Sequence, residues 1–201
     1  MSPLLIATTN AGKLREIRQA LSGIPVRLLS LADVPVIQEP EETGQTFAEN
    51  ARIKAEAYAA ATGLPTVAED SGLVIDAIGG RPGVESARYP GATYADKFAN
   101  LYRELQGKPE PWTARFVCSL AFLDEARLLG RDTRFACEGC VEGRIAREPR
   151  GANGFGYDPI FFYPPYGRTL GEASTEEKLA VSHRGAAFRE LRRYLTGSTV
   201  G

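Results

Sequence analysis

The sequence predicts an α/β fold with a mixed β-sheet, in a single domain that covers residues 1–201. Short apolar runs typical of strands alternate with stretches of helical periodicity, which favours helices packed on a sheet. Two long apolar runs follow each other later in the chain and predict a pair of neighbouring strands. The length of 201 residues suits one domain, and 43% hydrophobic with 24% charged residues is ordinary for a globular protein.

Periodicity and capping signals locate the individual elements. Leu14, Ile17 and Leu21 recur at helical spacing and predict a helix after the first strand. Thr46 and Glu49 have the spacing of a capping box, so an alanine-rich helix is expected to begin there. The expected strands are 4–7, 26–29, 65–75, 114–123 and 134–142, and the expected helices are 13–21, 47–62, 94–105 and one or two within 175–195.

Composition and charge exclude several classes of function. A net charge of −1 argues against broad nucleic-acid binding, which normally requires a basic excess. No apolar run approaches the roughly 20 residues of a transmembrane helix, and the N-terminus lacks the basic region and cleavage site of a signal peptide. Three cysteines, an odd number, argue against a disulfide scaffold. We therefore expect a cytoplasmic protein that binds neither nucleic acid nor membrane.

Glu69 and Asp70 are adjacent carboxylates at a point where an apolar strand is expected to break into Ser71 and Gly72. Burying such a pair is costly without a partner, and a metal ion is a common neutraliser. Successive strand residues project to opposite faces, so at most one carboxylate is expected to point into a site. The run predicts a Mg²⁺ site, with Ser71 and Gly72 opening a pocket of backbone N–H groups for a phosphate oxygen.

The segment Thr8-Thr9-Asn10-Ala11-Gly12-Lys13 lies at a strand-loop-helix junction. Backbone N–H groups at a helix N-terminus attract anions. Asn10 is expected to cap the helix, Gly12 to admit a ligand close to the backbone, and Lys13 to supply positive charge. The segment is not a Walker A loop, which requires other residues at positions 7 and 14. A capped helix with a surface lysine is the alternative to phosphate binding.

The other acidic residues of the first half have simpler explanations when they are considered singly. Glu41 and Glu42 lie in an expected loop and would be solvated, and the capping box accounts for Glu49. Asn50 and Lys54 are spaced i, i+4 on the alanine-rich helix and share a face. Lys54 is either part of a solvated face or a group that reaches a phosphate.

An aromatic loop and the lone histidine are candidates for recognition of a base. In Gly154-Phe155-Gly156-Tyr157-Asp158-Pro159 the glycines allow tight wrapping, and an aromatic face can stack on a base. A loop that caps the core is the alternative. Lys178 begins or precedes the last helix, and His183 is the only histidine, which excludes a multi-histidine zinc site. His183 and Arg184 can donate hydrogen bonds to purine oxygens, or form a surface patch at a helix start.

Cys137 and Cys140 form a single C-x-x-C motif. A structural zinc site would need a second pair, and a redox motif would open a helix after a strand. We interpret the motif as two thiols near a strand end.

Six motifs occur in an order that strongly resembles the inosine triphosphate pyrophosphatase family, and the likeness spans about Leu5 to Leu191. The motifs are Thr8 to Lys13; Glu41 to Gly44 with Thr46-Phe47 and Glu49-Asn50-Ala51; Glu69 to Leu73; Pro82-Gly83-Val84 with Ser86 to Tyr89; Gly154 to Pro159; and Ser182 to Gly185.

The resemblance implies an elongated α/β domain with a long mixed sheet flanked by helices, two lobes and a central active-site cleft. It also implies a homodimer. The implied reaction is hydrolysis of ITP, dITP and XTP, with Mg²⁺, to the monophosphate and pyrophosphate. Such an enzyme removes deaminated purines from the nucleotide pool.

The resemblance also implies roles for individual residues. Glu41 and Asp70 would hold the metal, and Asp70 would accept the proton of the attacking water. Phe155 would stack on the base. Glu69 stands where bacterial members often have Asp, and its contact is left open. The implied substrate contacts are Thr8, Thr9, Asn10, Ala11, Gly12, Lys13, Ser71, Phe155, Gly156, Tyr157, Asp158, Lys178, His183 and Arg184.

Two other functions are compatible with parts of the sequence. A pyrophosphatase of modified nucleotides, like the Maf family, is disfavoured by the motifs at Phe155 to Asp158 and His183-Arg184. A non-catalytic nucleotide-binding module is disfavoured by the full set of acidic residues, since a pure binder needs no general base.

Overall fold

The computed structural model describes residues 1–125 and 134–197. Within them the chain forms two compact units, each assembled from separate stretches of sequence. The described parts of residues 1–70, 118–139 and 183–201 make up unit 1, and those of 71–117 and 140–182 make up unit 2. Three long strands contribute residues to both units. The single domain expected over residues 1–201 stays a prediction.

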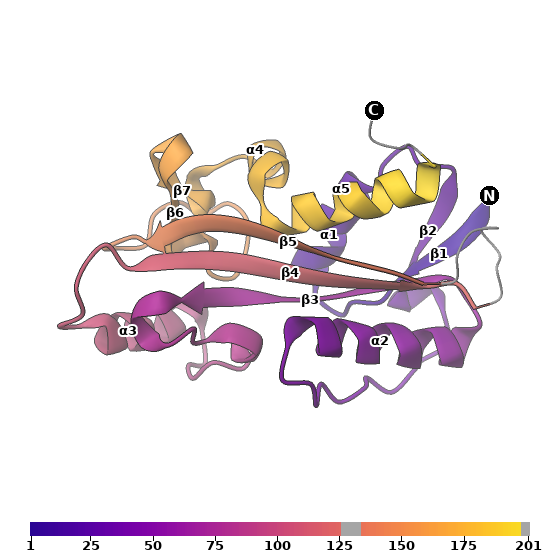
Figure 1. Ribbon diagram of the computed structural model, residues 1–201, viewed down its shortest axis with the longest axis horizontal. Coiled ribbons are helices and arrows are strands. Elements are labelled where there is room, and N and C mark those ends of the chain that lie inside the picture. The colour runs from indigo at the N-terminus through magenta and orange to yellow at the C-terminus, as the bar shows by residue number, and fades with distance from the viewer. Residues whose placement is uncertain (126–133, 198–201) are drawn as a thin grey trace. The chain divides into compact units, whose positions relative to one another are not determined.

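One mixed β-sheet runs through the described residues (Figure 1). Its strands are β1 (Ser2–Ile6), β2 (Val26–Ser30), β3 (Thr66–Ile75), β4 (Thr113–Leu123), β5 (Arg134–Ile145), β6 (Phe161–Tyr163) and β7 (Arg168–Thr169). Their order is β2-β1-β3-β4-β5-β6-β7. β1 pairs in parallel with β2 and β3, whereas β6 pairs antiparallel with β5 and β7. These pairings confirm the predicted α/β fold with a mixed sheet.

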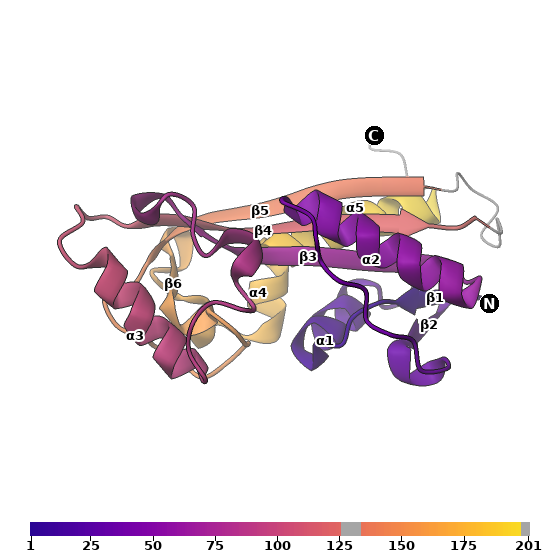
Figure 2. The ribbon, with the colours of Figure 1, turned by 90° about the horizontal axis from the view of Figure 1, so that it is seen from below.

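Helices cover both faces of the sheet in unit 1. They are α1 (Ala11–Ala20), α2 (Phe47–Thr62) and α5 (His183–Thr196). Figures 1 and 2 show α2 along one side of β3 and α5 on the other. Strand side chains alternate between these layers: Leu4 and Ile6 pack in a cluster with α1 and α5, while Leu5 and Ala7 pack with α2. A parallel strand covered on both faces is apolar throughout, as the run at 4–7 is.

Local capping fixes where the helices of unit 1 start. Asn10 accepts hydrogen bonds from the backbone N–H groups of Gly12 and Lys13, so α1 begins at Ala11, two residues before the expected start. The capping box of Thr46 and Glu49 is formed as predicted and starts α2. A left-handed residue at Gly63 ends that helix.

Unit 2 has its own apolar core and two helices, α3 (Tyr94–Leu105) and α4 (Thr175–Val181). Leu73 of β3, Phe98 and Leu101 of α3 and Phe161 of β6 belong to this core. The segment predicted to hold one or two closing helices contains two, because α4 ends at Val181 and α5 begins at His183. Within the described part of the chain, no helix has the length and apolarity to cross a membrane.

Candidate active site

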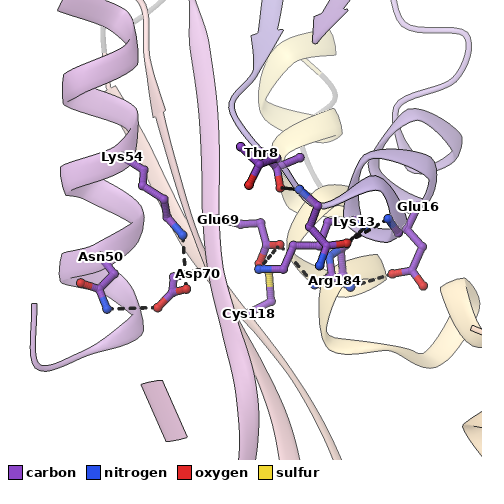
Figure 3. Close-up of polar contacts among 12 residues, drawn as sticks. Thr8, Lys13, Glu16, Asn50, Lys54, Glu69, Asp70, Cys118 and Arg184 are labelled. Atoms are coloured by element: carbon purple, nitrogen blue, oxygen red, sulfur yellow. Dashed lines mark hydrogen bonds and ion pairs between the residues drawn. The ribbon is translucent and has the colours of Figure 1, made fainter. Parts of the chain in front are cut away.

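The two adjacent carboxylates lie in the middle of β3. The strand predicted over 65–75 is confirmed as β3 (Thr66–Ile75), so the expected break at Ser71 and Gly72 within it is wrong. Ser71 and Gly72 are strand residues, so the expected loop-type pocket of N–H groups is not formed there. Glu69 and Asp70 are only 3% and 5% exposed. Their side chains leave opposite faces of the strand, as the alternation of strand residues predicts (Figure 3).

Asp70 faces α2 and is held by two side chains of that helix (Figure 3). Asn50 Nδ2 donates to Oδ2 of Asp70 at 3.2 Å, and Lys54 Nζ donates to Oδ1 at 3.3 Å. Asn50 in turn accepts a hydrogen bond from the backbone N–H of Gly44 at 2.8 Å, which fixes its orientation. Burial raises the pKa of Asp70, although the charge of Lys54 opposes that shift. Asp70 is thus a buried carboxylate with an increased affinity for a proton.

Lys54 joins Asp70 to the loop before α2. Its Nζ lies 2.5 Å from Oε1 of Glu42 and 3.3 Å from Oδ1 of Asp70. Burial opposes the charge of the ammonium, but Asp70 and Glu42 outweigh burial and raise the pKa of Lys54. Glu41, the predicted metal ligand, is exposed, whereas its neighbour Glu42 is half-buried. Lys54 is therefore not part of a solvated face, and the roles of Glu41 and Lys54 toward a ligand stay predictions.

Glu69 faces α1 and α5 and contacts one side chain of each helix and one of the neighbouring strand β4 (Figure 3). Its Oε1 lies 3.0 Å from Lys13 Nζ and 3.2 Å from Arg184 Nη2, and Cys118 Sγ donates to its Oε2 at 3.3 Å. Arg184 Nη1 also pairs with Oε2 of Glu16 at 2.7 Å. Burial alone would raise the pKa of Glu69, but Arg184 and Lys13 hold that pKa well below its usual range.

The segment at residues 8–13 forms the predicted strand-loop-helix junction. Asn10 Oδ1 accepts from the backbone N–H of Gly12 at 2.9 Å and of Lys13 at 3.1 Å. Thr8 Oγ1 accepts from the N–H of Asn10 at 3.2 Å, and Thr9 Oγ1 donates to Glu39 at 3.4 Å. Thr9, Asn10 and Ala11 are exposed. The junction therefore presents the positive end of a helix and the ammonium of Lys13 on one element.

Unit 2 brings the aromatic loop and Lys178 together. Lys178 Nζ lies 2.5 Å from Asp158 Oδ2 and 4.5 Å from the centre of the Phe155 ring. The same carboxylate oxygen accepts from the N–H of Phe155 at 2.7 Å. A Cβ on Gly154 would lie 2.1 Å from Asp158 Oδ2, so only glycine allows this close approach. The loop is thus a fixed platform of one ring and one ammonium.

Tyr157 is part of the core of unit 2. It is 4% exposed, and its hydroxyl donates to the carbonyl of Ser86 at 2.7 Å. This agrees with the alternative of a loop that caps the core. A contact of Tyr157 with substrate stays a prediction, as it does for Ser71, Gly156 and Asp158.

His183 and Arg184 lie at the start of α5 in unit 1, with exposures of 4% and 2%. The alternative of an exposed surface patch is wrong, because both side chains are buried. Their expected contact with a base stays a prediction. The structure thus assembles Lys13 and Arg184 around Glu69 in unit 1, and Phe155, Asp158 and Lys178 in unit 2.

The chain matches the model of the Ham1 family over residues 4–194. It belongs to the Ham1 family. It is 48% identical over 198 residues to a dITP/XTP pyrophosphatase of Geobacter sulfurreducens, with 97% of each chain covered. It is 46% identical over 194 residues to a dITP/XTP pyrophosphatase of Shigella flexneri, with 95% of this chain and 96% of that protein covered.

Solved Ham1 structures have the same fold. A HAM1 protein from Coxiella burnetii matches with a TM-score of 0.86 and 41% identity, covering 98% of this chain and 100% of that one. A nucleoside-triphosphatase, also described as a dITP/XTP pyrophosphatase, from Mycobacterium abscessus matches with a TM-score of 0.74 and 42% identity, covering 94% and 98%. These matches confirm the resemblance stated from the motifs.

Sequence reasoning missed two members of this Ham1 site, Glu16 and Cys118. Glu16 is a glutamate on a helix face that the pattern assigns to solvent, yet it is only 4% exposed. Cys118 occupies an alternating position among the apolar residues of β4 and is fully buried. The alternation of that strand was the available signal for Cys118, whereas no local pattern marks Glu16.

Cys137 and Cys140 do not lie near a strand end as expected. Both residues lie well inside β5, not near its end, because the strand extends from Arg134 to Ile145. Their odd spacing sends the two side chains to opposite faces of the strand. Cys137 Sγ donates to the carbonyl of Ala187 at 3.3 Å, and burial raises the pKa of Cys137 to about 12. The two thiols therefore do not act as a pair.

Proposed function

We propose that this Ham1 protein hydrolyses dITP, XTP and ITP to the nucleoside monophosphate and pyrophosphate, and so removes deaminated purines from the nucleotide pool. The names of its full-length relatives at 46–48% identity support this activity. The structural observation that carries it is Asp70, a carboxylate buried on β3 with a raised pKa and two donors from α2. A nucleotide binder without catalysis has no need of such a group.

The donor chemistry around Asp70 fits a magnesium ion. Carboxylate oxygens are the side-chain ligands that Mg²⁺ prefers, and the ion is commonly held by one or two carboxylates together with substrate phosphates. Within residues 1–125 and 134–197, no three His, Cys, Asp or Glu side chains converge as a metal cage. A site of one or two protein carboxylates completed by phosphates agrees with that finding. We propose Asp70 and Glu41 as its ligands, with Glu42 beside them.

Bound to phosphate oxygens, Mg²⁺ would neutralise their charge and make the phosphorus easier to attack. The residues of the chain supply the remaining chemistry. Asp70 would take the proton of the water that attacks the α-phosphorus, since it is a buried carboxylate held in place by Asn50 and Lys54. The bond from this phosphorus to the bridging oxygen breaks, and pyrophosphate leaves. Lys13, Lys54 and the N-terminus of α1 would stabilise the charge on the departing pyrophosphate.

Recognition of the base falls to the platform in unit 2. Phe155 would stack on the purine, and the ammonium of Lys178, already above that ring at 4.5 Å, would donate to an oxo group. A donor that meets the 6-oxo group accepts ITP and XTP. The 6-amino group of ATP places a donor against a donor, which leaves buried polar groups without partners. The contacts of His183 and Arg184 with the base belong to the same proposal.

The decisive experiment is a nucleotide panel at fixed Mg²⁺ with product identification. We expect dITP and XTP to yield monophosphate and pyrophosphate much faster than dATP, dTTP or dUTP. Release of orthophosphate with dIDP as product would contradict the proposal. A preference for dTTP or dUTP would favour the Maf-like alternative, and tight binding of dITP without turnover would favour a binding module.

We also propose that the protein acts as a homodimer in the cytoplasm. The family resemblance supports the dimer, and a substrate from the nucleotide pool supports the location. Light scattering coupled to gel filtration tests the first statement, with a mass near twice 21.8 kDa expected. Fractionation of cells tests the second.

A further inference from the structure

Glu69 is a buried carboxylate of the candidate site, and the reaction proposed above gives it no role. We propose that Glu69 is a positioning residue: it holds the ammonium of Lys13 when no nucleotide is bound and competes with phosphate for it. Glu69 is therefore not a metal ligand. This inference rests on the proposed function only in taking Lys13 as a phosphate-binding group.

The contacts of Glu69 account for both of its oxygens. Oε1 lies 3.0 Å from Lys13 Nζ and 3.2 Å from Arg184 Nη2, and Oε2 accepts from Cys118 Sγ at 3.3 Å. Its side chain leaves β3 on the face opposite to Asp70 (Figure 3). A metal held by Asp70 would thus lie across the strand from this carboxylate.

The cluster around Glu69 balances its charges. Lys13 and Arg184 are cations, and Glu16 and Glu69 are carboxylates, with Arg184 bound to both carboxylates at 2.7 and 3.2 Å. Each partner is thereby neutralised inside unit 1, which is what burial of ions requires.

Lys13 is the most exposed member of the cluster. The side chain of Lys13 is 17% exposed, against 2% for Arg184 and 1% for Glu69. A phosphate that reaches this cluster therefore meets Lys13 first. Since Lys13 is already paired with Glu69, the phosphate must share or displace that carboxylate. The competition weakens binding of polyphosphates, including the pyrophosphate product, which favours product release.

The inference predicts a gain of affinity on loss of a charge. In Glu69→Gln the amide oxygen can still accept from Arg184 and Lys13, but the negative charge is gone. We expect pyrophosphate to bind about fivefold more tightly, because the ammonium of Lys13 no longer has to leave a partly exposed ion pair with Glu69 worth about 1 kcal/mol. In Glu69→Asp the charge remains but the shorter side chain withdraws from Lys13. That variant should bind pyrophosphate about twofold to threefold more tightly, because its ion pair with Lys13 is weakened and not abolished.

The test is calorimetric titration of the full-length protein with pyrophosphate in the absence of divalent metal. Wild type, Glu69→Asp and Glu69→Gln are compared, each checked for native circular dichroism. A double-mutant cycle adds Lys13→Met to wild type and to Glu69→Gln. In the Lys13→Met background we expect the gain from Glu69→Gln to shrink to about twofold or less, because coupling between contacting groups is then lost.

Equal or weaker pyrophosphate binding in folded Glu69→Gln and Glu69→Asp would overturn the inference, since a carboxylate that competes for Lys13 must weaken pyrophosphate binding in the wild type. If Glu69→Gln does not fold, Glu69→Asp decides by the same criterion. A gain that persists in full without Lys13 would also overturn it.

A second measurement separates the positioning role from metal binding. The Mg²⁺ concentration for half-maximal dITP hydrolysis should be unchanged in Glu69→Asp, and a shift of tenfold or more would identify Glu69 as a ligand and overturn the inference. If wild type binds pyrophosphate but does not hydrolyse dITP, the proposed function fails while the titration series still tests Glu69.

Discussion

Arg184 is the cation on which the buried cluster of unit 1 depends, and replacing it gives a quantitative test. The guanidinium is 2% exposed and pairs with Glu16 at 2.7 Å and Glu69 at 3.2 Å. Arg184→Met keeps a long apolar side chain but leaves both carboxylates buried without this partner. Breaking a buried ion pair on one side costs about 3–5 kcal/mol of stability.

The structure places the expected loss near the lower end of that range. Glu69 retains Lys13 at 3.0 Å, so the missing charge falls mainly on Glu16. We expect a loss of about 3 kcal/mol, and since 1 kcal/mol shifts the Tm of a protein of this size by roughly 2–4 °C, a decrease of about 6–12 °C in Tm.

Urea and thermal unfolding at pH 7, followed by circular dichroism, measure this loss. The matched control is Arg193→Met on the same helix, whose ion pair with Glu190 is about half exposed on both sides. That variant should change stability by no more than about 0.5 kcal/mol. A loss below about 1 kcal/mol in Arg184→Met would refute the reasoning, because it would mean that the carboxylates are hydrated or relieved elsewhere.

The same cluster fixes the sign of a pH dependence. The pKa of Glu69 is lowered in the folded protein, chiefly because the charges of Arg184 and Lys13 overcome its burial. The stability that Glu69 contributes is therefore fully present above its unfolded pKa of about 4.3 and is lost as the pH falls through its lower folded pKa. Removing Arg184 weakens this shift, so the stability difference between wild type and Arg184→Met should narrow as the pH is lowered below about 4.

Three further substitutions, two of them with a control variant, and one chelation test other parts of the proposal. Asp70→Asn should lower kcat for dITP by about 10²–10⁴-fold with the fold intact, whereas Asp76→Asn, which alters an exposed carboxylate, should leave kcat unchanged in the same assay. Excess EDTA should abolish turnover, and added Mg²⁺ should restore it. Phe155→Ala should raise KM for dITP about tenfold, since stacking on a base is worth about 1–3 kcal/mol, and Phe155→Tyr should keep KM near wild type. Thr46→Ala should cost about 1 kcal/mol in urea unfolding through loss of the α2 cap, with kcat unaffected.

The elements predicted best from the sequence are those whose periodicity or capping residues lie within or directly beside the element. Helix α3 runs from Tyr94 to Leu105, the residues expected from periodicity alone. The start of α2 followed from the reciprocal bonds of Thr46 and Glu49, which involve residues only three positions apart. Such local interactions depend only on residues within a short segment, so they can be predicted without the rest of the fold.

The parts of the site that could not be predicted from the sequence depend on contacts between residues far apart in the chain. Glu16 and Arg184 meet across 168 positions, and Cys118 reaches Glu69 across 49. The expected break of the strand at Ser71 failed for a related reason. Ser71 and Gly72 suggested a loop and a metal ion beside it, whereas cations from three helices neutralise the two carboxylates inside the strand.

The adjacency of Glu69 and Asp70 suggested one shared site, but the geometry of a strand argues against a common role for the two carboxylates. Neighbouring strand residues face opposite layers, so each carboxylate meets the lysine of a different helix: Lys54 of α2 for Asp70, and Lys13 of α1 for Glu69. The two then differ in acidity, with the pKa raised at Asp70 and lowered at Glu69. Glu69 meets two cations, which suits the fixing of Lys13, whereas Asp70 meets one cation and the amide of Asn50, which suits proton acceptance. The different partners on the two faces of β3 thus assign the pair two distinct roles.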